Sequence, residues 1–221
     1  QAFRGCGKSW ICSAYVVHQL LLDPSLNILV VSASKTRSDD FSTFTLRLIN
    51  EMEILHHLRP KDNQRQSKIS FDVGPAPASH APSVKSLGIS SQLTGSRADI
   101  IIADDIEVAN NSATMLMREK LSEQVKEFDA ILKPDDTSKV LFLGTPQTFD
   151  SIYTKLQERG YKSQIWPATH ITQSHNEKIY DGNVAGICVD AEMENRSTEP
   201  LRFSDVDLAE RKISYGSAGY T

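Results

Sequence analysis

The sequence of 221 residues lacks long apolar runs and has few cysteines. No stretch of about 18 consecutive apolar residues occurs, and no charged-then-apolar leader is evident, so we expect neither a membrane-spanning helix nor secretion. The three cysteines, Cys6, Cys12 and Cys188, are an odd number and lack the spacing of metal ligands. We therefore expect free thiols in a reducing compartment, which predicts a cytoplasmic protein.

An excess of basic residues is also absent. The chain has 24 Lys and Arg against 28 Asp and Glu, which gives a formal net charge of -4. That balance disfavours a surface coated in positive charge, although it does not exclude local contacts with DNA phosphates. The length is sufficient for one large α/β domain with a substantial core.

Apolar periodicity predicts that strands and helices alternate along the chain. The first helix is expected to bury Trp10, Ala14, Val17 and Leu21 on one face. The alternation favours an α/β layer fold with a mostly parallel sheet. Helices are expected at 8–22, 36–58, 112–132, 151–159 and 204–213, and strands at 27–32, 69–73, 84–89, 99–103, 139–143, 161–166 and 186–189.

Residues 2–9, Ala-Phe-Arg-Gly-Cys-Gly-Lys-Ser, have the pattern of a phosphate-binding loop. Such a loop needs small residues whose backbone N–H groups point at phosphate, a lysine that reaches the phosphate oxygens, and a hydroxyl for magnesium. Ala2 stands where the general pattern has glycine, and the alternative is a chance Gly-Lys-Ser at a helix N-terminus. The predicted nucleotide-binding residues are Gly5, Cys6, Gly7, Lys8 and Ser9.

The loop begins at the first residues of the sequence, whereas such loops ordinarily follow a core β-strand. We therefore expect that the chain is truncated at its N-terminus, before the first strand of the fold.

Residues 100–105, Ile-Ile-Ile-Ala-Asp-Asp, indicate an apolar strand that delivers carboxylates at its end. Phosphate-loop enzymes hold magnesium with such an acid, opposite the loop hydroxyl. We predict that Asp104 and Ser9 bind the metal, and that either Asp105 or Glu107 is the base that orients the attacking water. The alternative is a strand that ends in a solvated Asp-Asp turn.

Three further residues are candidates for the chemistry. Arg4 lies inside the loop and is predicted to stabilise charge on the transferred phosphoryl group, whereas Arg97 is equally consistent with a strand-edge role. Thr145 follows the strand expected at 139–143, and the tips of such strands line a nucleotide crevice. It is a candidate γ-phosphate sensor, with an ordinary strand-to-helix turn as the alternative.

Taken together, residues 2–9, 95–107, 143–147 and 151–153 resemble the large terminase subunit of tailed bacteriophages, of the DNA maturase and packaging type found in short-tailed phages. The resemblance implies a three-layer phosphate-loop NTPase fold of the ASCE, RecA-like type. It also implies an ATPase that uses ATP and Mg²⁺ to drive double-stranded DNA into a prohead. The expected partners are the portal protein, the small terminase subunit and further copies in a ring on the portal, in the host cytoplasm and without a membrane.

By position, the resemblance places Lys8 and Ser9 on phosphate and magnesium, and Thr145 in the motif that couples ATP hydrolysis to movement. The second acid of the family's pair is commonly glutamate, so the aspartate at position 105 keeps Glu107 as an alternative base. The ATPase domain is expected to span residues 1–200. Residues 201–221 are expected to form a linker or lid that leads to an absent nuclease domain, so no nuclease activity is expected of this chain.

Two other functions are consistent with the same residues. One is a helicase-like or remodelling ATPase that acts on nucleic acid with the same core. The other is a nucleotide-binding assembly module that does not hydrolyse its ligand.

Overall fold

The computed structural model describes residues 1–148 and 150–215. The chain forms two compact units, of which the larger is Gly7–Leu143 and the smaller combines Gln1–Cys6 with Gly144–Thr221. The expected functional division near residue 200 falls inside the smaller unit and stays a prediction. Among the described residues, no helix is both long enough and apolar enough to cross a membrane.

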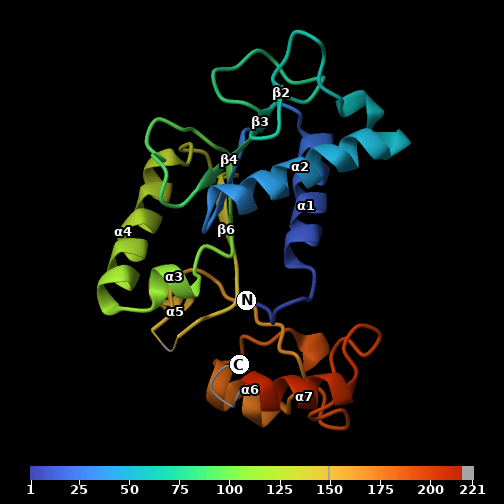
Figure 1. Ribbon diagram of the computed structural model, residues 1–221, viewed down its shortest axis with the longest axis vertical. Helices are drawn as coiled ribbons and strands as arrows, with labels where there is room; N and C mark the ends of the chain where they lie inside the picture. Colours follow the sequence, from blue (N-terminus) through green and yellow to red (C-terminus); the bar gives the residue numbers. More distant parts are fainter. Residues whose placement is uncertain (149, 216–221) are drawn as a thin grey trace. The chain divides into compact units, whose positions relative to one another are not determined.

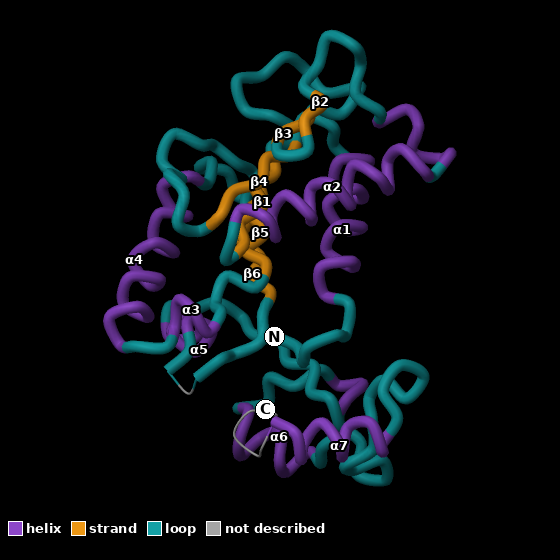
Figure 2. The backbone as a smooth tube through the Cα atoms, in the orientation of Figure 1, coloured by secondary structure: helices purple, strands orange, loops and turns teal. Residues whose placement is uncertain are grey.

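The larger unit contains a six-stranded mixed sheet. Its strands are arranged in the order β2-β3-β4-β1-β5-β6, which Figure 2 shows in orange. Neighbours among β4, β1, β5 and β6 are parallel, whereas β2 and β3 join antiparallel at one side. The predicted α/β fold with a mostly parallel sheet is therefore confirmed. The strands are β1 (Ile28–Ser32), β2 (Gln66–Ser67), β3 (Ser70–Phe71), β4 (Val84–Gly88), β5 (Ile100–Asp104) and β6 (Lys139–Leu143).

Helices cover both faces of this sheet. In Figure 1, α1 and α2 lie on one face and α4 lies on the other. The helix expected over 36–58 is divided at Met52, which has an extended backbone, and the helix expected over 112–132 is divided where Thr114 caps α4. The helical elements are α1 (Lys8–Leu22), α2 (Lys35–Glu51), the 3₁₀ helix η1 (Glu53–Leu58), α3 (Ala109–Ser112) and α4 (Met115–Ile131).

The two central strands place the acidic residues at one edge of the sheet. All five residues of β1 and all five of β5 are buried, as expected for parallel strands that are covered on both faces. In the pairing of β1 with β5, Ile28 lies opposite Ile100 and Ser32 lies opposite Asp104. The carboxyl ends of the parallel strands thus meet at one edge, and Asp104 is the last residue of β5 there.

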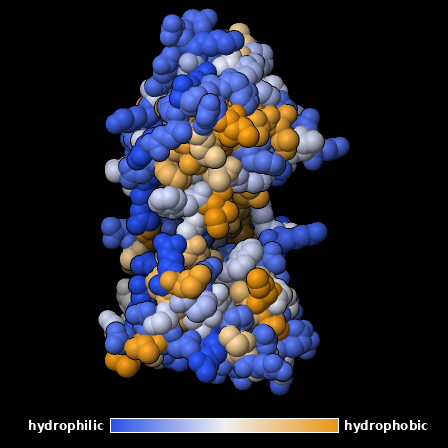
Figure 3. Space-filling model, turned by 90° about the vertical axis from the view of Figure 1, so that its right-hand side faces the viewer, coloured by the Kyte–Doolittle hydropathy of each residue, from blue (hydrophilic) through white to orange (hydrophobic). Residues whose placement is uncertain are grey.

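The apolar face predicted for α1 is right for Val17 alone among its four residues. Val17 is buried, whereas Trp10 and Leu21 are 68% and 41% exposed and Ala14 is also exposed. Cys12, Val16 and Leu20 are buried with Val17. Ser9, whose hydroxyl is bonded to Asp104, lies on the same face as these buried residues, because residues three, four, seven and eleven positions after it share that face of a helix. Figure 3 shows apolar side chains on the surface of the larger unit, and Ile11 and Leu22 of α1 are among its exposed residues.

The smaller unit consists of short helices joined by loops. The strand expected at 161–166 takes part only in isolated bridges, between Ala2 and Trp166 and between Ile165 and Val184. The helix expected from Ser204 is confirmed as α7, and the Ser204 hydroxyl caps it by accepting a hydrogen bond from the backbone N–H of Asp207 at 3.2 Å. The helical elements are α5 (Ile152–Glu158), α6 (Gln173–Tyr180), the 3₁₀ helix η2 (Gly186–Cys188) and α7 (Asp205–Tyr215).

The strand expected at 186–189 is wrong, because η2 occupies Gly186–Cys188 and Val189 takes part only in an isolated bridge with Ile171. Ala185 and Cys188 are buried in a small apolar cluster with Ile171 and Val184. Residues three apart lie on the same side of a 3₁₀ helix, whereas a strand would send them to opposite faces. A short apolar run is compatible with a strand or a helix, and the burial of Ala185 and Cys188 in one cluster is consistent with the helix.

The three cysteines are free thiols, as predicted. Burial raises the pKa of the Cys12 thiol to about 12, and the nearby Asp104 charge acts in the same direction. Because the thiolate is the reactive form of cysteine, Cys12 is expected to be inert at neutral pH.

Gly144, which follows β6, gives a test of packing in the smaller unit. A Cβ atom at this position would lie 1.7 Å from the hydroxyl oxygen of the buried Tyr153. Because the tyrosine has to move to make room, we expect Gly144→Ala to lower the free energy of unfolding by about 1–3 kcal/mol in urea denaturation. Gly186→Ala is the matched control, since nothing lies within 4 Å of its Cβ position. Equal stability of the two variants would contradict the packing argument.

Candidate active site

The predicted loop leads directly into α1. Gly7 is the N-cap of this helix and has a φ of 85°, and Gly5 has a φ of 91°. Glycine adopts such left-handed conformations without the steric cost that other residues meet, which explains the two glycines of the motif. Lys8 is the first residue of α1, so the loop ends where a 15-residue helix begins, and the first N–H groups of a helix have no partner within the helix itself. A helix N-terminus of this kind favours an anion.

Ser9 and Asp104 are brought together by the fold although 95 positions separate them in the sequence. The Ser9 hydroxyl donates a hydrogen bond of 2.7 Å to Oδ2 of Asp104. The other carboxylate oxygen, Oδ1, is buried and has no hydrogen-bond partner among the described residues. An unpaired buried acceptor costs about 1–3 kcal/mol, so this oxygen is a strong candidate to contact a bound ligand.

The charge of Asp104 is held in an unfavourable environment. Burial raises the pKa of its carboxyl group, because desolvation penalises the ionised form, and the carboxylate of Asp105 acts in the same direction. The Ser9 hydrogen bond and the cations of Lys8 and Arg37 oppose that shift. A further cation nearby would therefore stabilise the ionised form of Asp104.

This environment predicts a stability effect of Asp104→Asn. The variant keeps an oxygen that accepts from Ser9 and removes the buried charge. In metal-free buffer at neutral pH, we therefore expect a higher melting temperature and a free energy of unfolding that is larger by on the order of 1 kcal/mol. A carboxyl group with a raised folded pKa contributes stability below its unfolded pKa, which is near 3.8, and loses it as pH rises through the folded value. The gain should therefore vanish in acid, and thermal melts from pH 3 to 8 measure it. A gain that is independent of pH would show that charge is not its cause.

The next two acids differ in their surroundings. Asp105 has a left-handed backbone with φ of 46°, and its N–H donates to the carbonyl of Leu143 at 2.8 Å. It is partly exposed and lines a cavity together with Asp104. Glu107 is 2% exposed and does not line that cavity. Of the two predicted bases, the structure therefore places Asp105 where it can meet a ligand.

The cavity has a volume of about 440 Å³ and lies within the larger unit. Ser9, Asp104 and Asp105 were predicted from the sequence, and the remaining lining residues were not. Arg37 is the cation among them. It lies in the first turn of α2, directly after β1, and since β1 ends at the same sheet edge as β5, that topology is the signal that points to it. The other lining residues are Trp10, Ser13, Asp40, Phe41 and Phe44.

In the smaller unit, the predicted residues Arg4 and Thr145 belong to one chain of hydrogen bonds. Arg4 donates to the side-chain oxygen of Gln147 at 2.7 Å, and the Gln147 amide donates to the carbonyl of Thr145 at 2.8 Å. The Thr145 hydroxyl in turn donates to the carbonyl of Ala2 at 2.8 Å. Thr145 therefore holds the start of the loop, a contact that the sequence did not predict.

The chain was compared with known proteins. No family model matches it. It is 51% identical, over an alignment of 229 positions that takes in the whole chain, to the terminase large subunit of Enterobacteria phage T3. The chain is a relative of the phage large terminases. It spans 39% of the length of that T3 protein. The resemblance inferred from residues 2–9, 95–107, 143–147 and 151–153 is thereby confirmed.

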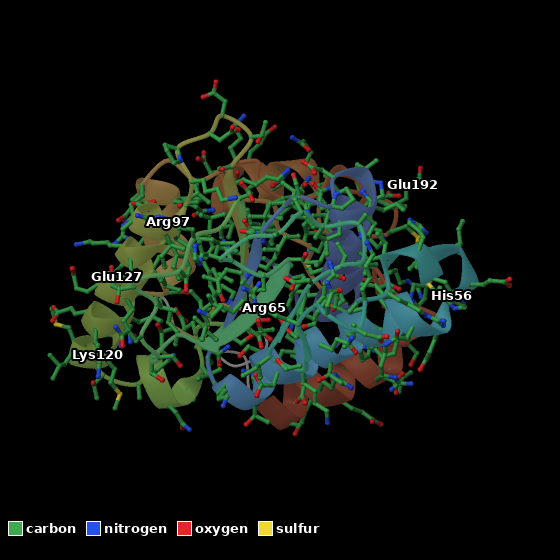
Figure 4. All side chains as sticks on the ribbon, turned by 90° about the horizontal axis from the view of Figure 1, so that it is seen from above. His56, Arg65, Arg97, Lys120, Glu127 and Glu192 are labelled. Atoms are coloured by element: carbon green, nitrogen blue, oxygen red, sulfur yellow. The ribbon has the colours of Figure 1, made fainter. Side chains whose placement is uncertain are left out.

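In this terminase relative, Arg97 has a structural contact away from the acidic residues. Its guanidinium donates to the carbonyl of Ala130 near the end of α4, and Figure 4 shows Arg97 beside that helix. Arg97 precedes β5, whereas Asp104 is the last residue of that strand. Of the two roles left open for Arg97, the structure favours the one at the strand edge.

Proposed function

We propose that this chain is an ATPase that supplies the energy for packaging viral DNA. The observation that carries the proposal is the hydrogen bond between Ser9 and Asp104, because it joins a hydroxyl at the start of a glycine-loop helix to an acid at the end of a buried parallel strand. Phosphate-loop enzymes place their magnesium between such a pair of residues. The similarity to a terminase large subunit supports packaging as the purpose.

The arrangement of the larger unit supports a three-layer phosphate-loop NTPase of the ASCE, RecA-like type. Parallel strands carry helices on both faces, and the acidic residues lie at the carboxyl edge. In open α/β sheets, ligands bind outside the carboxyl ends of the strands. The candidate site lies at that edge.

The residues present fit a magnesium ion. Mg²⁺ prefers oxygen ligands and is bound through one or two protein side chains together with water and substrate phosphates. Ser9 offers a hydroxyl oxygen, and Asp104 offers the unpartnered Oδ1. We propose that these two residues hold the ion, directly or through water. When bound, it would neutralise charge on the phosphates of ATP.

Each remaining residue of the proposed site has a distinct task. The backbone of Gly5, Cys6 and Gly7 would face the phosphates, and the Lys8 ammonium would contact their oxygens. Arg4 would stabilise the charge that develops during transfer, once it leaves its contact with Gln147. Thr145 positions the loop through the carbonyl of Ala2.

We propose Asp105 as the base that orients the attacking water, with Glu107 as the alternative. Asp105 lines the cavity beside Asp104, and a base has to reach the water within hydrogen-bond distance. The buried position of Glu107 suits a role in holding the turn after β5.

The partners follow from the proposed role. We propose that the complete protein acts on double-stranded DNA with the portal of a prohead and the small terminase subunit, as a ring in the host cytoplasm. We assign no nuclease activity to these residues.

Purified protein gives a direct test of this function. We expect Mg²⁺-dependent ATP hydrolysis and ATP-dependent protection of DNA from nuclease in the presence of proheads. Unwinding of duplex DNA without prohead-dependent packaging would favour the helicase-like alternative. Saturable ATP binding without turnover, in both the presence and the absence of proheads, would favour the non-hydrolysing assembly module.

A further inference from the structure

Phe203 contacts the proposed phosphate loop from a distant part of the sequence. Both belong to the smaller unit, which contains Gln1–Cys6. The Phe203 ring packs edge-on against Phe3, with 5.6 Å between ring centroids and an interplanar angle of 73°. A Cβ atom on Gly5 would lie 2.8 Å from Cζ of Phe203, so the ring rests against the α-carbon of Gly5. Phe203 thus touches the loop at the glycine that has a left-handed backbone.

The ring is itself held in place by the residues around it. The guanidinium of Arg211, in α7, lies over the ring at 4.5 Å from its centroid, and that of Arg202 lies at 5.9 Å. The backbone N–H of Phe203 donates to the carbonyl of Glu199 at 2.8 Å, and the next residue, Ser204, begins the cap of α7. With 7% of its surface exposed, Phe203 has little freedom to move away from Gly5.

A glycine loop needs such support more than other segments do. Glycine loses more conformational freedom on ordering than any other residue, so a loop with glycines at positions 5 and 7 is costly to hold in one shape. A loop that is already ordered before its ligand arrives does not incur that cost on binding. A rigid aromatic ring packed against Gly5 supplies this order.

We propose that Phe203 is a positioning residue for the phosphate loop. Its ring holds Gly5 in the left-handed conformation and so keeps the loop ready for the phosphates of a nucleotide. This inference rests on the proposed function, since it assigns the loop to ATP. It also gives the segment before α7 a task in nucleotide binding.

The test compares nucleotide binding by Phe203→Ala with binding by wild type. Fluorescence titrations with mant-ATP and mant-ADP measure both affinities, at a temperature where circular dichroism shows each variant folded. We expect Phe203→Ala to weaken both affinities about 10-fold, from the renewed cost of ordering loop residues. Since both nucleotides use the loop, the two losses should be similar. Turnover at saturating ATP should fall much less than affinity does.

Two conservative variants keep the test informative. Phe203→Leu retains apolar volume and should give an intermediate affinity. Phe203→Tyr places a hydroxyl on Cζ, the ring atom nearest Gly5, so it should push the loop away and weaken binding although the ring is kept. If Phe203→Ala does not fold, the comparison of Phe203→Leu and Phe203→Tyr with wild type decides instead. Equal affinities of the leucine, tyrosine and wild-type proteins would overturn the proposal.

Leu208 provides the control for a purely structural role. It is a buried residue of α7 in the same unit, so Leu208→Ala should lower the melting temperature, as Phe203→Ala does, without weakening nucleotide binding. Equal loss of affinity in both variants would show that Phe203 acts only through the stability of the unit. A wild-type protein that binds no nucleotide would instead overturn the proposed function, and the positioning role with it.

Discussion

Replacing Lys8 with alanine is expected to weaken ATP binding and hydrolysis severely while the fold is retained. Lys8 is the first residue of α1, and it lies outside the apolar core of the larger unit. In the proposed site its ammonium contacts phosphate oxygens through charge-assisted hydrogen bonds. The loss of two such bonds predicts an affinity weaker by on the order of 100-fold, and hydrolysis should fall at least as far.

The matched control for this prediction is Lys35→Ala. Lys35 is likewise the first residue of a helix, α2, and it is exposed and does not line the cavity. Calorimetric titration with ATP measures affinity, and circular dichroism shows whether both variants fold. If Lys8→Ala binds and hydrolyses ATP within a few-fold of wild type, while Lys35→Ala does the same, the loop is not a nucleotide site.

Asp105→Asn is expected to stop turnover while ATP binding persists. The variant removes the proposed base and keeps the shape of the side chain. Its effect on the backbone should be small, because asparagine is among the few residues that tolerate the left-handed conformation found at this position. General-base catalysis contributes about 10²–10⁴ in rate, and we expect kcat to fall within that range. Single-turnover hydrolysis at saturating ATP gives the measurement.

Glu107→Gln separates the two candidate bases. Because Glu107 is buried and does not line the cavity, its replacement should lower the melting temperature. It should leave kcat within about 10-fold of wild type, which is less than the loss of about 10²–10⁴ expected when a base is removed. The reverse outcome, with normal turnover in Asp105→Asn and none in Glu107→Gln at a temperature where both are folded, would assign the base to Glu107. That result would leave the assignments of Ser9 and Asp104 unchanged.

Much of the sheet was predictable because its central strands are buried on both faces. The continuous apolar runs in β1 and β5 leave few alternatives, and the predicted ends lie within one residue of those observed. The bounds of α1 also agree with prediction, since a glycine loop precedes it and Asp23 and Pro24 follow it. Local sequence patterns were sufficient to predict an element where it is a fully buried strand or is bounded by glycine and proline.

Contacts between distant segments could not be predicted in the same way. Two sets of apolar residues in α1 have helical spacing, one from Trp10 to Leu21 and one from Cys12 to Leu20, so periodicity within the helix does not decide which face is buried. Arg37 joins the cavity through the order of the strands, and Phe203 reaches Gly5 across almost the whole chain. In each case, tertiary packing decides which side chains meet.

The position of β1 in the sheet has a consequence for how the chain is synthesised and folds. β1 pairs with β4 and β5, and its register with β5 joins residues 72 positions apart. A nascent chain that has not yet reached residue 100 therefore leaves one edge of this apolar strand without its partner. Such edges promote aggregation, and pairings between distant residues slow folding. Truncated forms of the protein that end before Asp104 should accumulate as insoluble protein on expression, whereas forms that include β5 and β6 should not.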